Sequence, residues 1–89
     1  MLRAKSLKLK ALKSDYDGAK ECHVWMVRRT SRRVIGVIGS NDPHVCWIDT
    51  NGDSYCSCPR FQFILYLCKH LVVLAELFAG RKVEVVDRE

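Results

Sequence analysis

The 89-residue sequence predicts an α+β domain, in which antiparallel β-hairpins are followed by a β-β-α metal site and a C-terminal helix. Two pairs of β-rich runs are each separated by a short polar joint, which is typical of hairpins. Four cysteine and histidine side chains then occur as two close pairs, and a long apolar run follows the second pair. A core of this size is small enough for a bound metal to contribute much of the stability.

The first 20 residues are expected to form a basic N-terminal extension that is mainly helical. Lysine and arginine alternate with leucine and alanine there, and Leu2, Leu9 and Leu12 fall near one helical face. Residues 7–10 also alternate like a strand, so a strand is the alternative.

Residues 21–80 are expected to form a single β-rich domain. Runs 24–27 and 34–38 predict one hairpin, and runs 45–48 and 54–56 predict a second, whose Asn51-Gly52 suits a type I′ turn. Trp25 and Trp47 lie inside these runs, so we expect both in the core, with stacking on bases as the alternative. Gly80 ends the helix. The tail 81–89 either adds an edge strand or hangs loose.

The metal site is predicted by the pattern C-x-C-x9-C-x-H, formed by Cys56, Cys58, Cys68 and His70. Residues two apart on a strand project to the same side, so the first pair can close on one ion. Residues two apart on a helix lie about 200° apart, so Cys68 and His70 converge only if Cys68 stands where the helix begins. Three thiolates and one imidazole suit a single tetrahedral Zn²⁺ with a structural role.

Other uses of these side chains are less favoured. Cys56 and Cys58 are poor disulfide partners because their side chains run parallel at a long Cα separation. A catalytic pair of Cys68 and His70 has no nearby acid or amide to orient the base, so we expect no enzymatic activity. A second metal set is disfavoured because neighbours on a strand face opposite ways; its members would be Cys22, His23, His44 and Cys46.

The two pairs, with the apolar helix directly after the histidine, resemble the SWIM zinc finger over residues 53–77. The resemblance implies a β-β-α module at residues 45–80 that holds one zinc through Cys56, Cys58, Cys68 and His70. SWIM modules are associated with DNA-handling proteins, including transposases and recombinase-associated factors. The resemblance therefore implies DNA or partner-protein binding in recombination, repair, transposition or transcription.

Positive charge is concentrated in the N-terminal third. Residues 1–33 hold ten lysines and arginines against three acidic residues, a net of +7, whereas the remainder has five against seven, a net of −2. Such clusters attract polyphosphates, so we expect nucleic-acid contact, with DNA favoured. The candidate contact residues are Lys5, Lys8, Lys10, Lys13, Arg28, Arg29, Arg32 and Arg33.

A protein-interaction adaptor or a homo-oligomer is the competing function, and a redox or metal sensor is a weaker one. Only Glu76 is charged between residues 71 and 79, so part of this helix is expected to be exposed and to bind a partner or a second copy. The surface candidates are Leu71, Val72, Leu74, Ala75 and Phe78.

An intracellular, reducing compartment is expected, with the cytoplasm as the default. Five cysteines are an odd number, and charge stands where the apolar part of a signal peptide would begin. The apolar run 61–79 contains Lys69 and His70 near its centre, which argues against a membrane span.

Overall fold

The computed structural model describes residues 5–6 and 9–87, and it confirms the α+β class. The main sheet is antiparallel, with the order β1-β6-β5-β4-β3. Its strands are β1 (Lys5–Ser6), β3 (His23–Arg29), β4 (Arg33–Gly39), β5 (His44–Asp49) and β6 (Asp53–Cys56). Helix α2 (Lys69–Val73) packs on one face of this sheet and continues as a π-helical turn, η3 (Leu74–Phe78).

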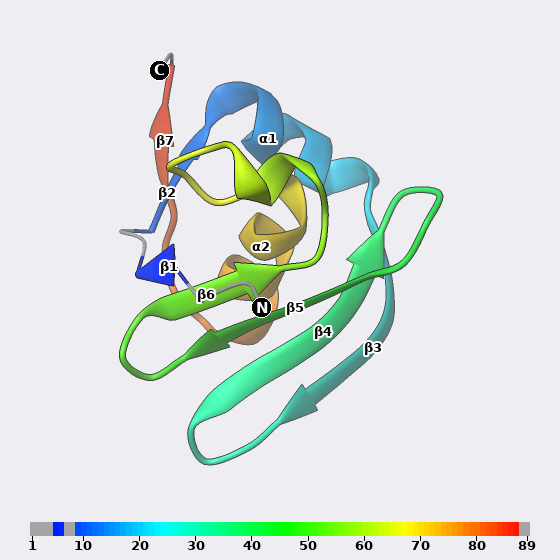
Figure 1. Ribbon diagram of the computed structural model, residues 1–89, viewed down its shortest axis with the longest axis vertical. Helices are drawn as coiled ribbons and strands as arrows, with labels where there is room; N and C mark the ends of the chain where they lie inside the picture. The colour runs from blue at the N-terminus through cyan, green and yellow to red at the C-terminus, as the bar shows by residue number, and fades with distance from the viewer. Residues whose placement is uncertain (1–4, 7–8, 88–89) are drawn as a thin grey trace.

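A second layer covers the other side of α2 (Figure 1). It consists of α1 (Lys13–Gly18), the 3₁₀ turn η1 (Ala19–Glu21), and a parallel pair of strands, β2 (Lys10–Leu12) and β7 (Glu84–Val86). The 3₁₀ turn η2 (Arg60–Gln62) lies in the connection between β6 and α2. Strands β2 and β7 therefore run side by side although they are far apart in the sequence, and Glu84–Val86 of the tail forms a strand.

The prediction of a helix in the N-terminal extension is wrong for Lys10–Leu12, and α1 accounts for only six residues of the extension. Ala11 and Leu12 are buried and pair with Val85 and Val86, so two segments that are far apart in sequence complete each other's backbone hydrogen bonds. Leu2 lies outside the described residues.

Both predicted hairpins are confirmed, as β3–β4 and β5–β6. In β4, Val34 and Ile38 point to the core, and Gly36 faces the same way. A Cβ atom at Gly36 would lie 2.9 Å from Cδ1 of Leu74. The glycine therefore lets the helix approach the sheet closely.

The turn at Asn51-Gly52 is not type I′, because that turn needs positive φ at both residues and only Gly52 has it, at 91°. The Gly52 N–H donates to the Asp49 carbonyl at 3.0 Å, and Oδ1 of Asp49 accepts from the N–H groups of Asn51 and Asp53, each at 3.0 Å. A three-residue loop with Gly in the left-handed position results. The Asp49 carboxylate stabilises this loop conformation by accepting hydrogen bonds from the backbone of the turn.

The expected exposure of the helix is wrong for Leu71, Val72, Leu74 and Ala75, all of which are buried. The sheet covers one side of the helix and the second layer covers the other, so no polar face is needed. Leu77 is exposed and Phe78 is half-buried. Among the described residues, no helix has the length and apolar character to cross a membrane.

The core placement of the tryptophans is also wrong. Trp25 has 51% of its surface exposed, and Trp47 is half-buried on the face of the sheet that points away from α2. Strand β3 lies at the edge of the sheet, and its register shifts between Val24 and Met26. This bulge contains Trp25 and interrupts the regular pairing of β3 with β4 at that residue.

Candidate metal centre

Two local backbone features position the four predicted ligands. Cys56 is the last residue of β6, and Cys58 follows after Ser57, whose N–H donates to the Val45 carbonyl at 2.9 Å. Cys68 is extended (φ −73°, ψ 169°) and stands directly before α2, as the spacing to His70 requires. The predicted β-β-α arrangement is thus formed by β5, β6 and α2.

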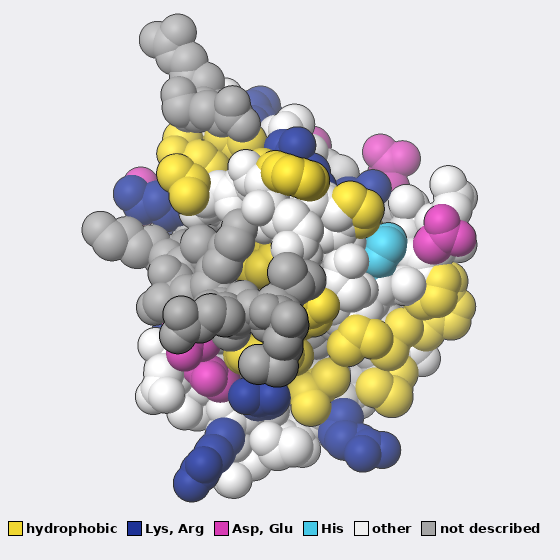
Figure 2. Space-filling model, viewed as in Figure 1, with side chains coloured by type: hydrophobic (Ala, Val, Ile, Leu, Met, Phe, Trp, Pro, Cys, Tyr) yellow, Lys and Arg dark blue, Asp and Glu magenta, His cyan; other side chains and the backbone are white. Residues whose placement is uncertain are grey.

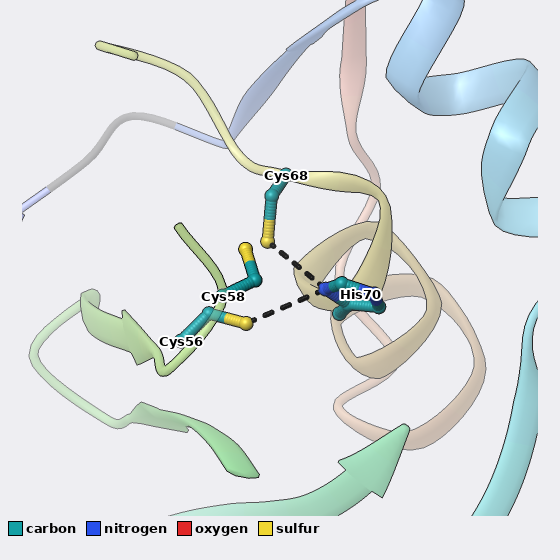
Figure 3. A group of neighbouring side chains, drawn as sticks. All are labelled: Cys56, Cys58, Cys68 and His70. Carbon is teal, nitrogen blue, oxygen red and sulfur yellow. Dashed lines mark hydrogen bonds between the residues drawn. The ribbon is translucent and has the colours of Figure 1, made fainter. Parts of the chain in front are cut away.

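The four side chains converge in the interior of the protein (Figure 3). Their ligand atoms all lie within 4.8 Å of one another, and all four residues are buried. Nδ1 of His70 is 3.5 Å from Sγ of Cys56 and 3.8 Å from Sγ of Cys68. Around a tetrahedral zinc with ordinary Zn–S and Zn–N distances, sulfur and nitrogen ligands are about 3.6 Å apart.

The donor set and its spacing therefore fit one Zn²⁺ ion, bound by three sulfurs and Nδ1 of the imidazole. Four protein ligands complete the coordination that is usual for structural zinc, which leaves no position for water or substrate.

The thiols also influence one another's ionisation. Hydrogen bonds from Cys56 and then Cys68 hold the pKa of Cys58 well below its usual value. Contacts with Cys46 and Cys58 raise the pKa of Cys56, and contacts with Cys56 and Cys58, together with burial, raise that of Cys68. A divalent cation can hold all three as thiolates.

Residues around the centre fix the connection between the two ligand pairs. Arg60 donates from Nε to Oδ1 of Asp15 at 2.9 Å and from Nη2 to Oδ2 at 2.8 Å. Lys69 reaches Oγ of Ser40 at 3.4 Å. Arg60 and Lys69 thus connect the metal-binding segment to α1 and to the β4–β5 loop, respectively.

The disfavoured second metal set does not assemble, because the four predicted ligands form the single metal-competent cluster in the described part of the chain. Sγ of Cys46 contacts the Gly36 carbonyl at 3.6 Å, and Sγ of Cys22 contacts the Gly18 carbonyl at 3.7 Å. The His44 ring lies 4.8 Å from the His70 ring, so it packs against the zinc ligand.

The predicted nucleic-acid residues separate into two regions. Lys10 lies 4.0 Å from Glu84, and Lys13 lies 3.3 Å from Asp17, so both have acidic partners. The side chains of Lys5 and Lys8 lie outside the described part of the structure. Lys13, at the start of α1, is at the opposite end of the molecule from the β3–β4 turn, which carries the predicted arginines (Figure 1).

Three of those arginines meet a fourth one that sequence reasoning missed. Arg29, Arg32, Arg33 and Arg81 line an open hollow of about 420 Å³, here called the arginine hollow. Phe78 and Asp49 also line it. None of the four arginines forms an ion pair with a described residue. The only sequence signal for Arg81 was its position directly after the helix-ending Gly80.

Comparison with protein families agrees with the geometry. Residues 44–78 match the family model described as the SWIM zinc finger, which includes all four ligands. No curated protein and no solved structure matches the chain significantly.

Proposed function

Starting from residues 44–78 as a SWIM zinc finger, we propose that this chain is a non-enzymatic module that binds nucleic acid, with DNA as the favoured form. Its contribution would be to recombination, repair, transposition or transcription. In this proposal the zinc is structural and the contacts are made elsewhere on the domain.

The observation that carries the proposal is the arginine hollow. Guanidinium groups bind phosphate oxygens through paired N–H donors, and they lose less hydration than ammonium groups when they do so. Four arginines without described ion-pair partners, around one hollow, form a concentrated site for a polyanion. The Asp49 carboxylate also lines the hollow, but its Oδ1 already accepts two backbone hydrogen bonds in the β5–β6 turn.

The zinc centre supports this surface through the fold. His70 lies in the first turn of α2, and the same helical segment ends at Phe78, after which Gly80 (φ 64°) turns the chain to Arg81. The Arg81 N–H donates to the Ala75 carbonyl at 2.8 Å, which fixes the backbone there. A metal that holds the start of the helix therefore also holds one wall of the hollow.

Fluorescence anisotropy with labelled DNA, across a range of salt concentrations, tests the proposal. The Arg29→Gln/Arg32→Gln variant should weaken binding and reduce the magnitude of the log–log salt slope by about 0.9 for each duplex phosphate that the protein no longer neutralises. Lys13→Gln/Lys20→Gln is the matched control, because it removes two positive charges at the far end of the molecule.

Unchanged binding by the control, together with weaker binding by the arginine variant, supports the hollow as the site. Equal losses in both variants would show a diffuse charge effect and would restore the lysine cluster as a contact region. No binding by the native protein at about 50 mM salt, where electrostatic contacts are strong, would overturn the proposal.

A protein-interaction role, including a homo-oligomer, is the second candidate, and the loop between Cys58 and Cys68 favours it. Phe63 and Leu65 in this loop are 85% and 80% exposed, respectively. Exposed apolar side chains that lie together mark binding surfaces. Sedimentation should then show a dimer for the native chain and a monomer for Phe63→Ser/Leu65→Ser. A native monomer at micromolar concentration would count against self-association.

A further inference from the structure

The face of the main sheet that points away from α2 is here called the outer face. The strand register shows which side chains lie next to one another on it. Residues paired across antiparallel strands point to the same side. One row runs Arg28–Ile35–Trp47, and the next runs Met26–Val37–Val45. The side chains of both rows are exposed or half-buried. Figure 2 shows hydrophobic side chains in a band over these strands, with basic side chains at its lower end.

Aromatic rings and arginines are combined on this face. The guanidinium carbon of Arg33 lies 3.9 Å from the centroid of the Trp47 ring, so a planar cation already stacks there. Trp25, in the β3 bulge, is half exposed, and its ring meets the His23 ring edge-on at 6.2 Å. His23 pairs with Gly39, which alternates with Ile35 and Val37 on the outer face, so the Trp25 ring lies on this side of the sheet. The Trp47 ring also stacks with the Tyr55 ring, with 6.2 Å between the ring centroids. The outer face therefore offers two flat surfaces, the exposed Trp25 ring and the Arg33 guanidinium that lies over Trp47.

Arg33 also links the outer face to the arginine hollow, because it lines the hollow and covers Trp47. A chain whose phosphates lie on the arginines would be led directly onto the rings. Bases of a single strand are free to stack on such rings, whereas the bases of a duplex are stacked on one another.

We propose that the outer face is a stacking platform for single-stranded nucleic acid, with bases on the Trp25 ring and on the Arg33 guanidinium that covers Trp47, and phosphates on Arg28. The proposal rests on the nucleic-acid function proposed above and names its substrate class. Charge complementarity favours this occupant over a second copy of the chain, because the platform and the hollow are basic and share Arg33.

Binding of a fluorescein-labelled 15-nucleotide oligothymidine and of a labelled 15-base-pair duplex tests the proposal. The native protein should bind the single strand at least 10-fold more tightly. Trp25→Ala and Trp47→Leu should each weaken single-strand binding about 5- to 150-fold, the factor that corresponds to the removal of one base–aromatic stack. Trp25→Phe should retain most of the affinity, and Val85→Ser, an exposed apolar site on β7, should retain all of it.

The salt slope separates this proposal from the one on which it rests. The tryptophan variants should lower affinity with an unchanged slope, whereas Arg29→Gln/Arg32→Gln should change the slope. Trp25 is half exposed, so its variant tests the platform even if Trp47→Leu unfolds.

Four results would overturn the platform. If Trp25→Ala bound the single strand as tightly as the native protein, or if the native protein preferred the duplex, base stacking would be excluded. The arginine-based nucleic-acid function would then remain. Tryptophan variants that alter sedimentation instead of binding would assign the face to self-association. Absence of binding to both probes at about 50 mM salt would remove the platform and the proposed function together.

Discussion

The carboxylate of Asp15 accepts hydrogen bonds from both Nε and Nη2 of Arg60, across 45 residues of sequence. The Asp15 side chain is only 6% exposed, whereas that of Arg60 is 47% exposed. Asp15 belongs to α1, and Arg60 is the second residue after the ligand Cys58. The pair therefore ties the second layer of the fold to the zinc-binding loop.

The two partners of this ion pair should differ in their effect on stability. Arg60→Met leaves a buried carboxylate without its bidentate donor and should lower the free energy of unfolding by about 2–4 kcal/mol. Asp15→Asn leaves a half-exposed guanidinium that water can solvate and should cost only about 1–2 kcal/mol. Chemical denaturation of the two single variants and of the double variant measures these free energies of unfolding and the coupling between the two residues. Equal costs, or no coupling in the double variant, would contradict the assignment.

Substitution by alanine should change the stability of the protein in opposite directions at two glycines. A Cβ atom at Gly39 would overlap the Asp42 carbonyl oxygen, so Gly39→Ala must displace the β4–β5 loop and should cost about 1–3 kcal/mol. Gly18 has helical angles, and its nearest side-chain atom, on Lys69, would be 3.4 Å away. Gly18→Ala should stabilise the protein by about 0.4–1 kcal/mol. Thermal melts of the zinc-loaded variants measure both effects. A shift of both melting temperatures in the same direction would contradict this prediction.

The five cysteines should divide by reactivity. In the zinc-loaded protein three are ligands and Cys46 is buried, so Cys22 alone should react with iodoacetamide. Burial raises the pKa of Cys22, so less thiolate is present at neutral pH and its reaction should accelerate as the pH rises above 8. Mass spectrometry should find one label before chelation and up to five after it. Rapid labelling of Cys58 in the loaded protein would contradict the zinc assignment.

Removal of the metal should abolish cooperative folding. Structural zinc contributes an apparent binding free energy of about 10–16 kcal/mol in small peptides, which exceeds the stability of a typical domain of this size. Excess chelator, Cys58→Ser or His70→Ala should therefore each remove the thermal transition seen by circular dichroism. A metal-free protein that melts as cooperatively as the loaded one would show that the core suffices.

The sequence predicted the features that depend on local geometry. The ligand spacing required Cys68 to precede the helix, and the β-rich runs defined both hairpins. Pairings between distant segments were not accessible in this way. The segment that forms β2 was expected to be helical, and nothing local to β7 specifies its partner. The same limit explains the buried helix and the exposed Trp25. An apolar run does not indicate which of its faces another segment covers.

The most direct test of the central claim is X-ray absorption spectroscopy at the zinc K edge of the purified protein. One zinc per chain should show three sulfur ligands at about 2.3 Å and one nitrogen ligand at about 2.0–2.1 Å, with no oxygen. This result would establish a closed structural site formed by Cys56, Cys58, Cys68 and His70. A shell containing a water oxygen, or fewer than three sulfurs, would contradict it.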